Sequence, residues 1–335
     1  MTEQKFRVLA SLRTVPRRAD AWQQQHPVVA FPVAVIRKFG DDRGGSLAAL
    51  VAYYGFFSIF PLLMVLDVVT ARALRGDSEL RRRVIDSAVA EFPVIGDQIR
   101  SNIGTIRGST FVLVFGFVGA IWAGMAVLTA IQSAMDEVWD VPRRERSAWL
   151  PRLFRGLIAL IALGLTVLVA TATASAAAAL GSWRAAAVGL AISTTLNVLT
   201  MAVIFRSSTS ARVSWNDVLP GAAIAGLVWT LLQAIGAYIV DRHIRGASNA
   251  YGTFAVVIGL LTWLYLGAQL TVIAAEINVV RCRRLWPRSL VSPPTRPEDE
   301  EALTLQARQE EALPSERVVV RFGGSVERKP TDQSL

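Results

Sequence analysis

Histidine and cysteine are nearly absent from this sequence. Its 335 residues contain two histidines, His26 and His243, and one cysteine, Cys282. Zinc and similar ions need three or four protein ligands, most often of these types, so the count argues against a transition-metal catalytic site. One cysteine also excludes a disulfide within the chain.

Motifs of common catalytic sites are missing as well. The sequence has no GxxxxGK[ST] loop for phosphate binding and no GxSxG nucleophile motif. We therefore expect a protein that is not an enzyme, with no catalytic residues, no metal and no cofactor. A magnesium site built from carboxylates alone stays open, and with it a membrane-bound hydrolase.

Charged residues are also scarce. They make up 18% of the chain, against 53% hydrophobic residues, whereas soluble domains carry about 25% charged residues. The hydrophobic residues form six runs near the ~20 residues that cross a bilayer as a helix. These runs cover about 47–69, 111–134, 153–177, 186–205, 216–240 and 254–280. The sequence predicts an all-α integral membrane protein, a bundle of six transmembrane helices with amphipathic interfacial helices.

The positive charge of the chain, +9 in total, lies mostly at the ends of these runs. One set of alternate flanking segments holds twenty Lys and Arg residues and the other set holds ten. Because cytoplasmic loops are enriched in these residues, both termini are predicted to be cytoplasmic. We expect a multi-pass protein of the bacterial cytoplasmic (inner) membrane, with the lipid bilayer rather than nucleic acid as its partner.

The chain divides into three parts by composition. Residues 1–46 are basic, with an interfacial helix expected over Val28–Phe39. Residues 47–285 hold the six spans and an outer amphipathic loop at 75–108 with helical periodicity. Residues 286–335 are rich in proline and acidic residues and poor in apolar ones, so we expect a disordered cytoplasmic tail.

The first span contains a proline beside polar side chains. Tyr54, Ser58 and Pro61 are spaced to share one helix face. Pro61 leaves the carbonyl of Phe57 without its helical donor, and inside a membrane that group needs another partner. The stripe predicts either a polar pathway with a proline-broken helix or a contact between packed helices.

Polar residues in other spans extend this candidate site. Gln269 and Glu276 share a face of the last span, and Arg281 or Arg284 would be the partner of Glu276 if it reaches the membrane surface. Asp136 lies at the inner end of the second span. The complete set, read as a polar pathway or as a helix-packing site, is Tyr54, Ser58, Pro61, Asp136, Gln269, Glu276 and Asn278.

Four stretches carry a family likeness. They are AYYGFFSIFPLL (52–63), SAMDEVWDVP (133–142), SWNDVLPGAAIAGLVW (214–229) and YGTFAVVIGLLTWLYLGAQLTVIAAEIN (251–278). Together they resemble the YihY/BrkB family of bacterial inner-membrane proteins over about 30–285, and are most similar to its YhjD-like branch. The sequence departs from the family pattern at Asp136, where asparagine is usual, and at Ala274, where glycine is frequent.

The resemblance implies six spans with internal ends, in agreement with the arginine count. The family's older label, ribonuclease BN, implies a nuclease, but the missing metal ligands argue against that activity. We expect a transporter or translocator of a lipid, an ion or a small solute in the cell envelope. The alternative is a non-catalytic assembly scaffold, which forms a homo-oligomer or binds an envelope protein through the 75–108 loop and the acidic tail.

Overall fold

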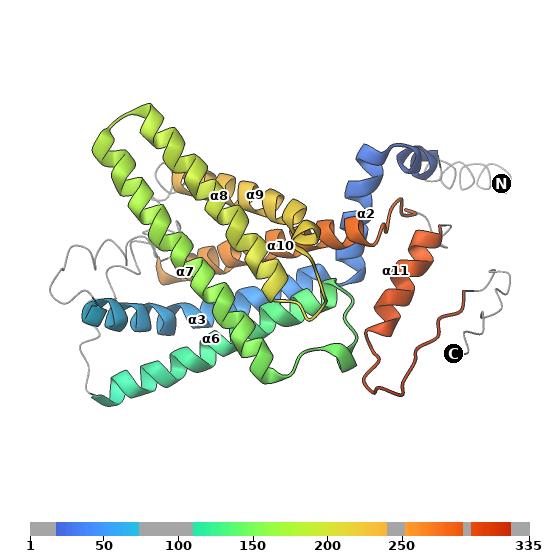
Figure 1. Cartoon of the computed structure of the whole chain (residues 1–335), viewed down its shortest axis with the longest axis horizontal. Coiled ribbons are helices and arrows are strands. Elements are labelled where there is room, and N and C mark those ends of the chain that lie inside the picture. Colours follow the sequence, from blue (N-terminus) through green and yellow to red (C-terminus); the bar gives the residue numbers. More distant parts are fainter. Residues whose placement is uncertain (1–17, 74–109, 240–251, 291–295, 323–335) are drawn as a thin grey trace, which may run out of the picture.

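The computed structural model describes residues 18–73, 110–239, 252–290 and 296–322, and all regular structure in these ranges is helical (Figure 1). The predicted outer loop at 75–108 lies outside the described residues. The helices are α2 (Pro27–Asp41), α3 (Gly44–Ala73), α6 (Thr110–Val138), α7 (Trp149–Leu180), α8 (Trp183–Ser207), α9 (Trp215–Ile239), α10 (Gly252–Cys282) and α11 (Pro297–Arg308). A helical stretch at 18–25 precedes α2, and a 3-10 turn, Arg143–Glu145, follows α6.

The central helices have the length and surface of membrane helices. A helix rises 1.5 Å per residue, so even the 25 residues of α8 or α9 span about 38 Å, more than the ~30 Å hydrocarbon core. Four helices, α7 to α10, are long and apolar enough to cross a membrane over their described residues. On α7 large apolar side chains such as Ile158, Ile161 and Leu165 face outward. The predicted all-helical membrane class is confirmed.

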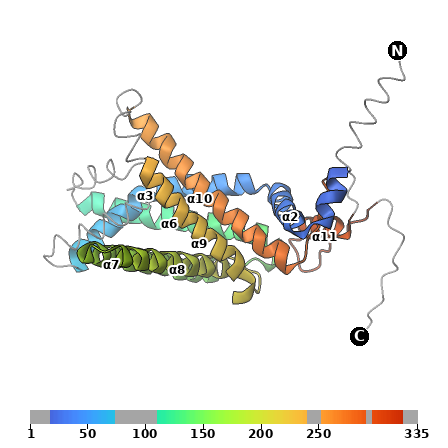
Figure 2. The ribbon, with the colours of Figure 1, turned by 90° about the horizontal axis from the view of Figure 1, so that it is seen from above.

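Helix α10 is the centre of the bundle. It packs against α2, α3, α6 and α9, whereas α7 packs mainly on α8 and α8 on α9 (Figure 2). Helices α3 and α6 form a second pair beside α10. One end of the bundle, where α2, α11 and the C-terminal ends of α6 and α10 meet, is called the α2/α11 end below (Figure 1).

Small residues allow α9 to approach its neighbours closely. A Cβ at Gly226 would lie 2.7 Å from the backbone nitrogen of Val198 on α8, and a Cβ at Gly221 would collide with the carbonyl oxygen of Ala274 on α10. Ala222, between them, is fully buried. Glycine is therefore required at both positions by backbone contact with two different helices.

Helix α3 differs from the predicted proline-broken helix. It runs without interruption from Gly44 to Ala73, through Pro61. A proline removes one backbone hydrogen bond and need not end a helix that neighbours support. The hydroxyl of Ser58 is buried and donates to the carbonyl of Gly55 at 2.8 Å rather than to that of Phe57.

A helix, α2, covers Val28–Phe39, where the interfacial helix is expected. Pro27 occupies its first turn, where a proline is tolerated because the N–H is not needed. Val28 and Ile36 are exposed on one face, as in helices that lie on a membrane surface. The opposite face, with Ala34 and Val35, is buried against Val280 of α10.

The expectation of a disordered tail from 286 onward is wrong for the described residues 286–290 and 296–322. Arg288 is 1% exposed, and its Nε donates to Asp299 of α11 at 2.5 Å while its Nη2 donates to Asp41 of α2 at 2.8 Å. Ala302 is buried in the main hydrophobic core. The composition predicted disorder because this segment has few apolar residues. In the structure, buried ion pairs hold the segment in place instead.

Candidate functional site: a buried ionic cluster

Four charged side chains meet at the α2/α11 end, and are called the buried ionic cluster. Lys38 comes from α2, Asp42 from the turn after it, Asp140 from the end of α6 and Glu276 from α10. The Lys38 Nζ lies 3.2 Å from Asp140 Oδ1 and 3.9 Å from Glu276 Oε2, and it forms an ion pair with Asp42 one helical turn away. All four side chains are at most 1% exposed. Such burial of charges requires close pairing.

The end of α6 places Asp140 in the cluster. Asp140 has φ 51°, and the N–H groups of Asp140 and Val141 donate to the carbonyls of Glu137 and Asp136. This is the Schellman ending of a helix, in which the residue after the cap is left-handed. Glycine is usual there, and aspartate is among the few side chains that tolerate it. An unusual residue at the helix end therefore supplies a carboxylate to the site.

Asp140 is saturated by partners from two further elements. Arg283, in the turn just after α10, lies 3.3 Å from Asp140 Oδ2 and also donates to the carbonyl of Trp139. Gln309, just after α11, donates to Asp140 Oδ1 at 2.8 Å and to the carbonyl of Glu137 at 2.9 Å. The tail thus completes the site.

Burial and charge shift the pKa values of the two cluster residues outside the spans. Burial alone would lower the pKa of Lys38, but the charges of Glu276, Asp140 and Asp42 overcome this and raise it above its ordinary value. Burial, together with the charge of Asp140, raises the pKa of Asp42 to about 6, although Lys38 opposes the shift. Lys38 therefore stays charged, and Asp42 titrates close to neutrality.

Some oxygens of the cluster have no hydrogen-bond partner. They are both carboxyl oxygens of Glu276, which is 0% exposed, and Oδ1 of Asp42. A buried acceptor without a donor is costly. The hydrogen bonds of Lys38 go to Asp42, Asp140 and the carbonyl of Val138 instead.

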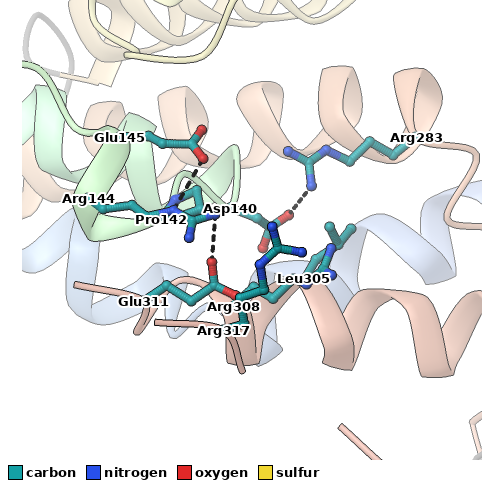
Figure 3. Close-up of a pocket in the computed structure, with 9 residues that line it drawn as sticks. All are labelled: Asp140, Pro142, Arg144, Glu145, Arg283, Leu305, Arg308, Glu311 and Arg317. Atoms are coloured by element: carbon teal, nitrogen blue, oxygen red, sulfur yellow. Dashed lines mark hydrogen bonds and ion pairs between the residues drawn. The ribbon is translucent and has the colours of Figure 1, made fainter. Parts of the chain in front are cut away.

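Two cavities reach the cluster from outside the bundle. The first, about 310 Å³, lies between the end of α6, α10 and the tail, with Asp140 and Arg283 on its wall (Figure 3). Arg144, Arg308 and Arg317 line it too, and Figure 3 shows Arg144 paired with Glu311. The second, about 920 Å³, also has Asp140 and Arg283 in its lining. Asp140 thus borders both cavities, whereas Glu276 borders neither.

Asp136 lies in a separate junction of α6, α7 and the segment after α8. One oxygen accepts from the backbone N–H of Ser210 at 2.5 Å and from Thr209 at 3.3 Å. The other accepts from the Ser210 hydroxyl at 3.1 Å and from Arg152 at 3.3 Å. With every lone-pair direction used, this buried carboxylate acts as a structural acceptor that joins three segments.

The other predicted site residues are placed apart from the cluster. Asn278 accepts from the N–H of Gly221 at 2.7 Å and so joins α10 to α9. Gln269 is half-buried and donates to the Tyr265 hydroxyl on its own helix at 3.0 Å. Tyr54 is half-buried on α3, where its ring packs edge-on against Tyr53, and Ser58 bonds within α3. Pro61 is placed only by its backbone, within α3.

Of the predicted set, Glu276 alone belongs to the cluster, and its expected partners were wrong. Arg281 donates to the carbonyl of Asn216, and Lys38 takes the place expected for Arg281 or Arg284. Lys38, Asp42 and Asp140 were missed. A signal existed, since the chain has three lysines against 32 arginines and Lys38 precedes Asp42 by the four residues of a helical ion pair.

An all-helical membrane protein with a buried ionic cluster at one end of its bundle is the class that the fold and the site define. The chain belongs to the family described as virulence factor BrkB, whose model matches residues 35–298. The predicted resemblance to the YihY/BrkB family is thereby confirmed. The match begins just before Lys38 and includes all four residues of the cluster.

Several relatives are membrane proteins by name. The chain is 24% identical to the inner membrane protein YhjD of Escherichia coli (strain K12), with 82% of this chain and 87% of the relative covered. It is also 24% identical to YfkH of Bacillus subtilis (strain 168), whose name describes it as ribonuclease-like, over 76% of this chain and 96% of the relative. It is 23% identical to the UPF0761 membrane protein Smlt0865 of Stenotrophomonas maltophilia (strain K279a), over 75% of this chain and 60% of the relative. No solved structure matches the chain.

Proposed function

We propose that this chain is a non-enzymatic transporter or translocator of a lipid, an ion or a small solute in the bacterial cytoplasmic membrane. In this proposal six helices, α3 and α6 to α10, cross the membrane. Helices α2 and α11 lie at the same end of the bundle, which supports an even number of spans with both termini in the cytoplasm. The cluster then sits at the cytoplasmic end, consistent with the arginines around it.

The observation that carries the proposal is Glu276. It lies on a helix long and apolar enough to cross the membrane, is completely buried and has no hydrogen-bond partner for either oxygen. Ionisable groups inside membrane helices are expensive, and they mark ion and substrate pathways in pumps and transporters. A carboxylate used only to hold helices together would be saturated, as Asp136 is.

A hydrolytic role fits the cluster less well. Of its three carboxylates, Asp140 borders the cavities, while Asp42 and Glu276 border neither of them. Asp140 is itself occupied by Lys38, Arg283 and Gln309. The site presents no free carboxylate to a substrate that enters from either cavity.

The scaffold alternative relied on the tail as a docking surface. Described residues of that tail instead pack on the bundle, where Gln309 bonds to Asp140 and Arg288 pairs with Asp41 of α2. A partner protein or a second copy of the chain would need a different surface.

Flux through the purified full chain tests the proposal. The protein is reconstituted into phosphatidylethanolamine and phosphatidylglycerol liposomes that contain a trapped pH dye or a fluorescent phospholipid. We expect proton leak or lipid scrambling above that of protein-free liposomes, and a reduced rate for Glu276→Gln. Arg143→Gln, which removes an exposed ion pair with Glu310, is the matched control. Rates equal to those of empty liposomes for both probes would contradict the proposal.

A further inference from the structure

The buried ionic cluster does not balance its own charge when every group is ionised. Asp42, Asp140 and Glu276 supply three negative charges, whereas Lys38 and the neighbouring Arg283 supply two positive ones. The three carboxylates are at most 1% exposed, so solvent does not screen the excess. An uncompensated buried charge is unfavourable enough that such a group is neutralised instead.

The positions of the unpartnered oxygens show where the missing positive charge belongs. They are Oδ1 of Asp42 and both oxygens of Glu276. Both side chains lie at the Lys38 ammonium, which forms an ion pair with Asp42 and lies 3.9 Å from Glu276 Oε2. Two ionised carboxylates have no donor between them, so a hydrogen bond between these two side chains requires a proton on one of them.

Contacts of Lys38 decide which partner holds the proton. Its ammonium is hydrogen-bonded to Asp42 and Asp140, which favours their ionised forms. Glu276 is farther away, at 3.9 Å, and receives no hydrogen bond from it. Glu276 is therefore the carboxylate that is least stabilised as an anion.

We propose that the Asp42–Glu276 pair is a proton-binding site, in which protonated Glu276 donates a hydrogen bond to Oδ1 of Asp42. One proton then brings the cluster to zero net charge and gives partners to two of the unpartnered oxygens. Two carboxyl groups that share a proton because they cannot both ionise are a known catalytic arrangement. Here the arrangement lies at the end of a membrane helix.

Several of the elements packed around the pair supply charged or polar groups. Helix α2 supplies Lys38, the end of α6 supplies Asp140, and the turn after α10 supplies Arg283, which contacts Asp140. The segment after α11 supplies the neutral Gln309. Helix α9 has Asp217 at its start, but that side chain accepts from Ser214 and Cys282 instead.

A metal cation fits the same place poorly. Calcium and magnesium take six or more oxygen ligands, and the pair offers three free oxygens. The Lys38 ammonium, 3.9 Å from Glu276, would also repel a second cation. No group of three or more potential metal-binding side chains occurs in the parts of the chain that the structure describes.

The site also gives the proposed function a coupling ion. This step rests on the transport proposal, whereas the protonation of Glu276 does not. When Glu276 releases its proton to water, it becomes a third carboxylate that competes for Lys38. Proton binding would thus change which residues α2 contacts on α10, at the end of the bundle where both cavities open.

Infrared spectroscopy of the full chain in nanodiscs tests the site directly. At pH 7 we expect the carbonyl band of a protonated carboxylic acid in the wild type. The band should be absent from Glu276→Gln, and it should persist at a shifted frequency in Asp42→Asn because its acceptor is altered. Glu137→Gln is the control, since Glu137 is a carboxylate in a partly exposed ion pair with Arg146 outside the cluster. Identical spectra for wild type and Glu276→Gln would overturn the proposal.

A second measurement keeps the test decisive if a variant folds poorly. The wild-type band should disappear as the pH is raised. Absence of the band at every pH from about 5 to about 9 would also overturn the proposal. The outcome is separable from that of the flux assay. A band without flux leaves the proton site and removes the transport proposal, while flux without a band does the reverse.

Discussion

The ammonium of Lys38 lies 3.2 Å from the carboxylate of Asp140, although 102 residues separate them in the chain. Lys38 comes from a helix that also exposes apolar residues, as in surface helices, and Asp140 from the left-handed end of a long apolar helix. Their contact fixes α2 against the end of α6. Glu276 of α10 lies beside them, so this one contact connects three elements of the fold.

Removal of the Lys38 charge should strongly destabilise the protein. Lys38→Met leaves three buried carboxylates without their shared cation, and breaking a buried pair in this way costs about 3–5 kcal/mol. Thermal unfolding in detergent, followed by the fluorescence of the nine tryptophans, measures the loss. Arg143→Gln, at an exposed pair worth about 0–1 kcal/mol, should have little effect. Equal melting temperatures for both variants would contradict the burial of the cluster.

Stability should depend on the pH through Asp42. Burial raises the pKa of Asp42 from 3.8 to about 6, so between these values the folded state binds more protons than the unfolded state. The contribution of Asp42 to the free energy of unfolding is therefore fully present below about pH 4. It is lost as the pH rises through about 6, and the loss is at most about 3 kcal/mol. The difference in melting temperature between wild type and Asp42→Asn, measured from pH 4 to pH 7, isolates the effect. A constant difference over that interval would contradict it.

Asp136 should be needed for structure rather than for flux. Asp136→Ala removes the acceptor of Thr209, Ser210 and Arg152, and unsatisfied buried donors cost about 1–3 kcal/mol each. We expect a large fall in melting temperature and in the yield of folded protein. The neighbouring Glu137→Gln, at a partly exposed pair with Arg146, is the control. Asp136→Ala with wild-type stability would refute this role.

The order of the tail should depend on one buried arginine. Arg288→Met leaves Asp299 and Asp41 without their partner, and we expect α11 to detach. Hydrogen exchange of the backbone amides in α11 should rise by orders of magnitude, because local opening no longer breaks an ion pair. Exchange in α9 should stay unchanged and serves as the internal reference. Protection of α11 at the wild-type level would show that the apolar contacts suffice.

The contact between α9 and α10 should have no room for the methyl group that a glycine-to-alanine substitution adds. Gly221→Ala places a Cβ against the carbonyl of Ala274 and the amide of Asn278, and overpacking of this kind costs about 1–3 kcal/mol. Gly124→Ala, where no atom lies within 4 Å of the new Cβ, should be neutral or stabilising, since alanine favours helix by about 0.5–1 kcal/mol. Melting temperatures of the two variants give the comparison.

The fold class could be predicted from the sequence because it depends on long apolar runs and their flanking charges. The close α9 contacts are also encoded locally, because Ala222 and Gly226 are small residues four positions apart, which places them on one helix face. The partner of Glu276 could not be predicted in this way. Helical spacing relates residues on one element, whereas Lys38 reaches Glu276 through the packing of α2 on α10, which no local pattern encodes.

Disorder in the tail was predicted for a related reason. The rule weighs apolar area against chain entropy, and the tail has little apolar area. It does not consider that Arg288 and Gln309 find partners already placed by the rest of the fold, in Asp41 and Asp140. A polar segment can fold when another part of the chain supplies its opposite charges.

The dispersal of the cluster along the chain sets an order of events during synthesis. Lys38 leaves the ribosome about 240 residues before Glu276, an interval of roughly 12–50 s at ~5–20 residues per second. Gln309 and Asp299, which close the site, emerge later still. During that interval the lysine lacks the carboxylate of Glu276, whereas Asp42, four residues further on, is already made. Synthesis of the C-terminal segment is therefore the last step in completing the site, and a nascent chain stalled before it would keep the site open.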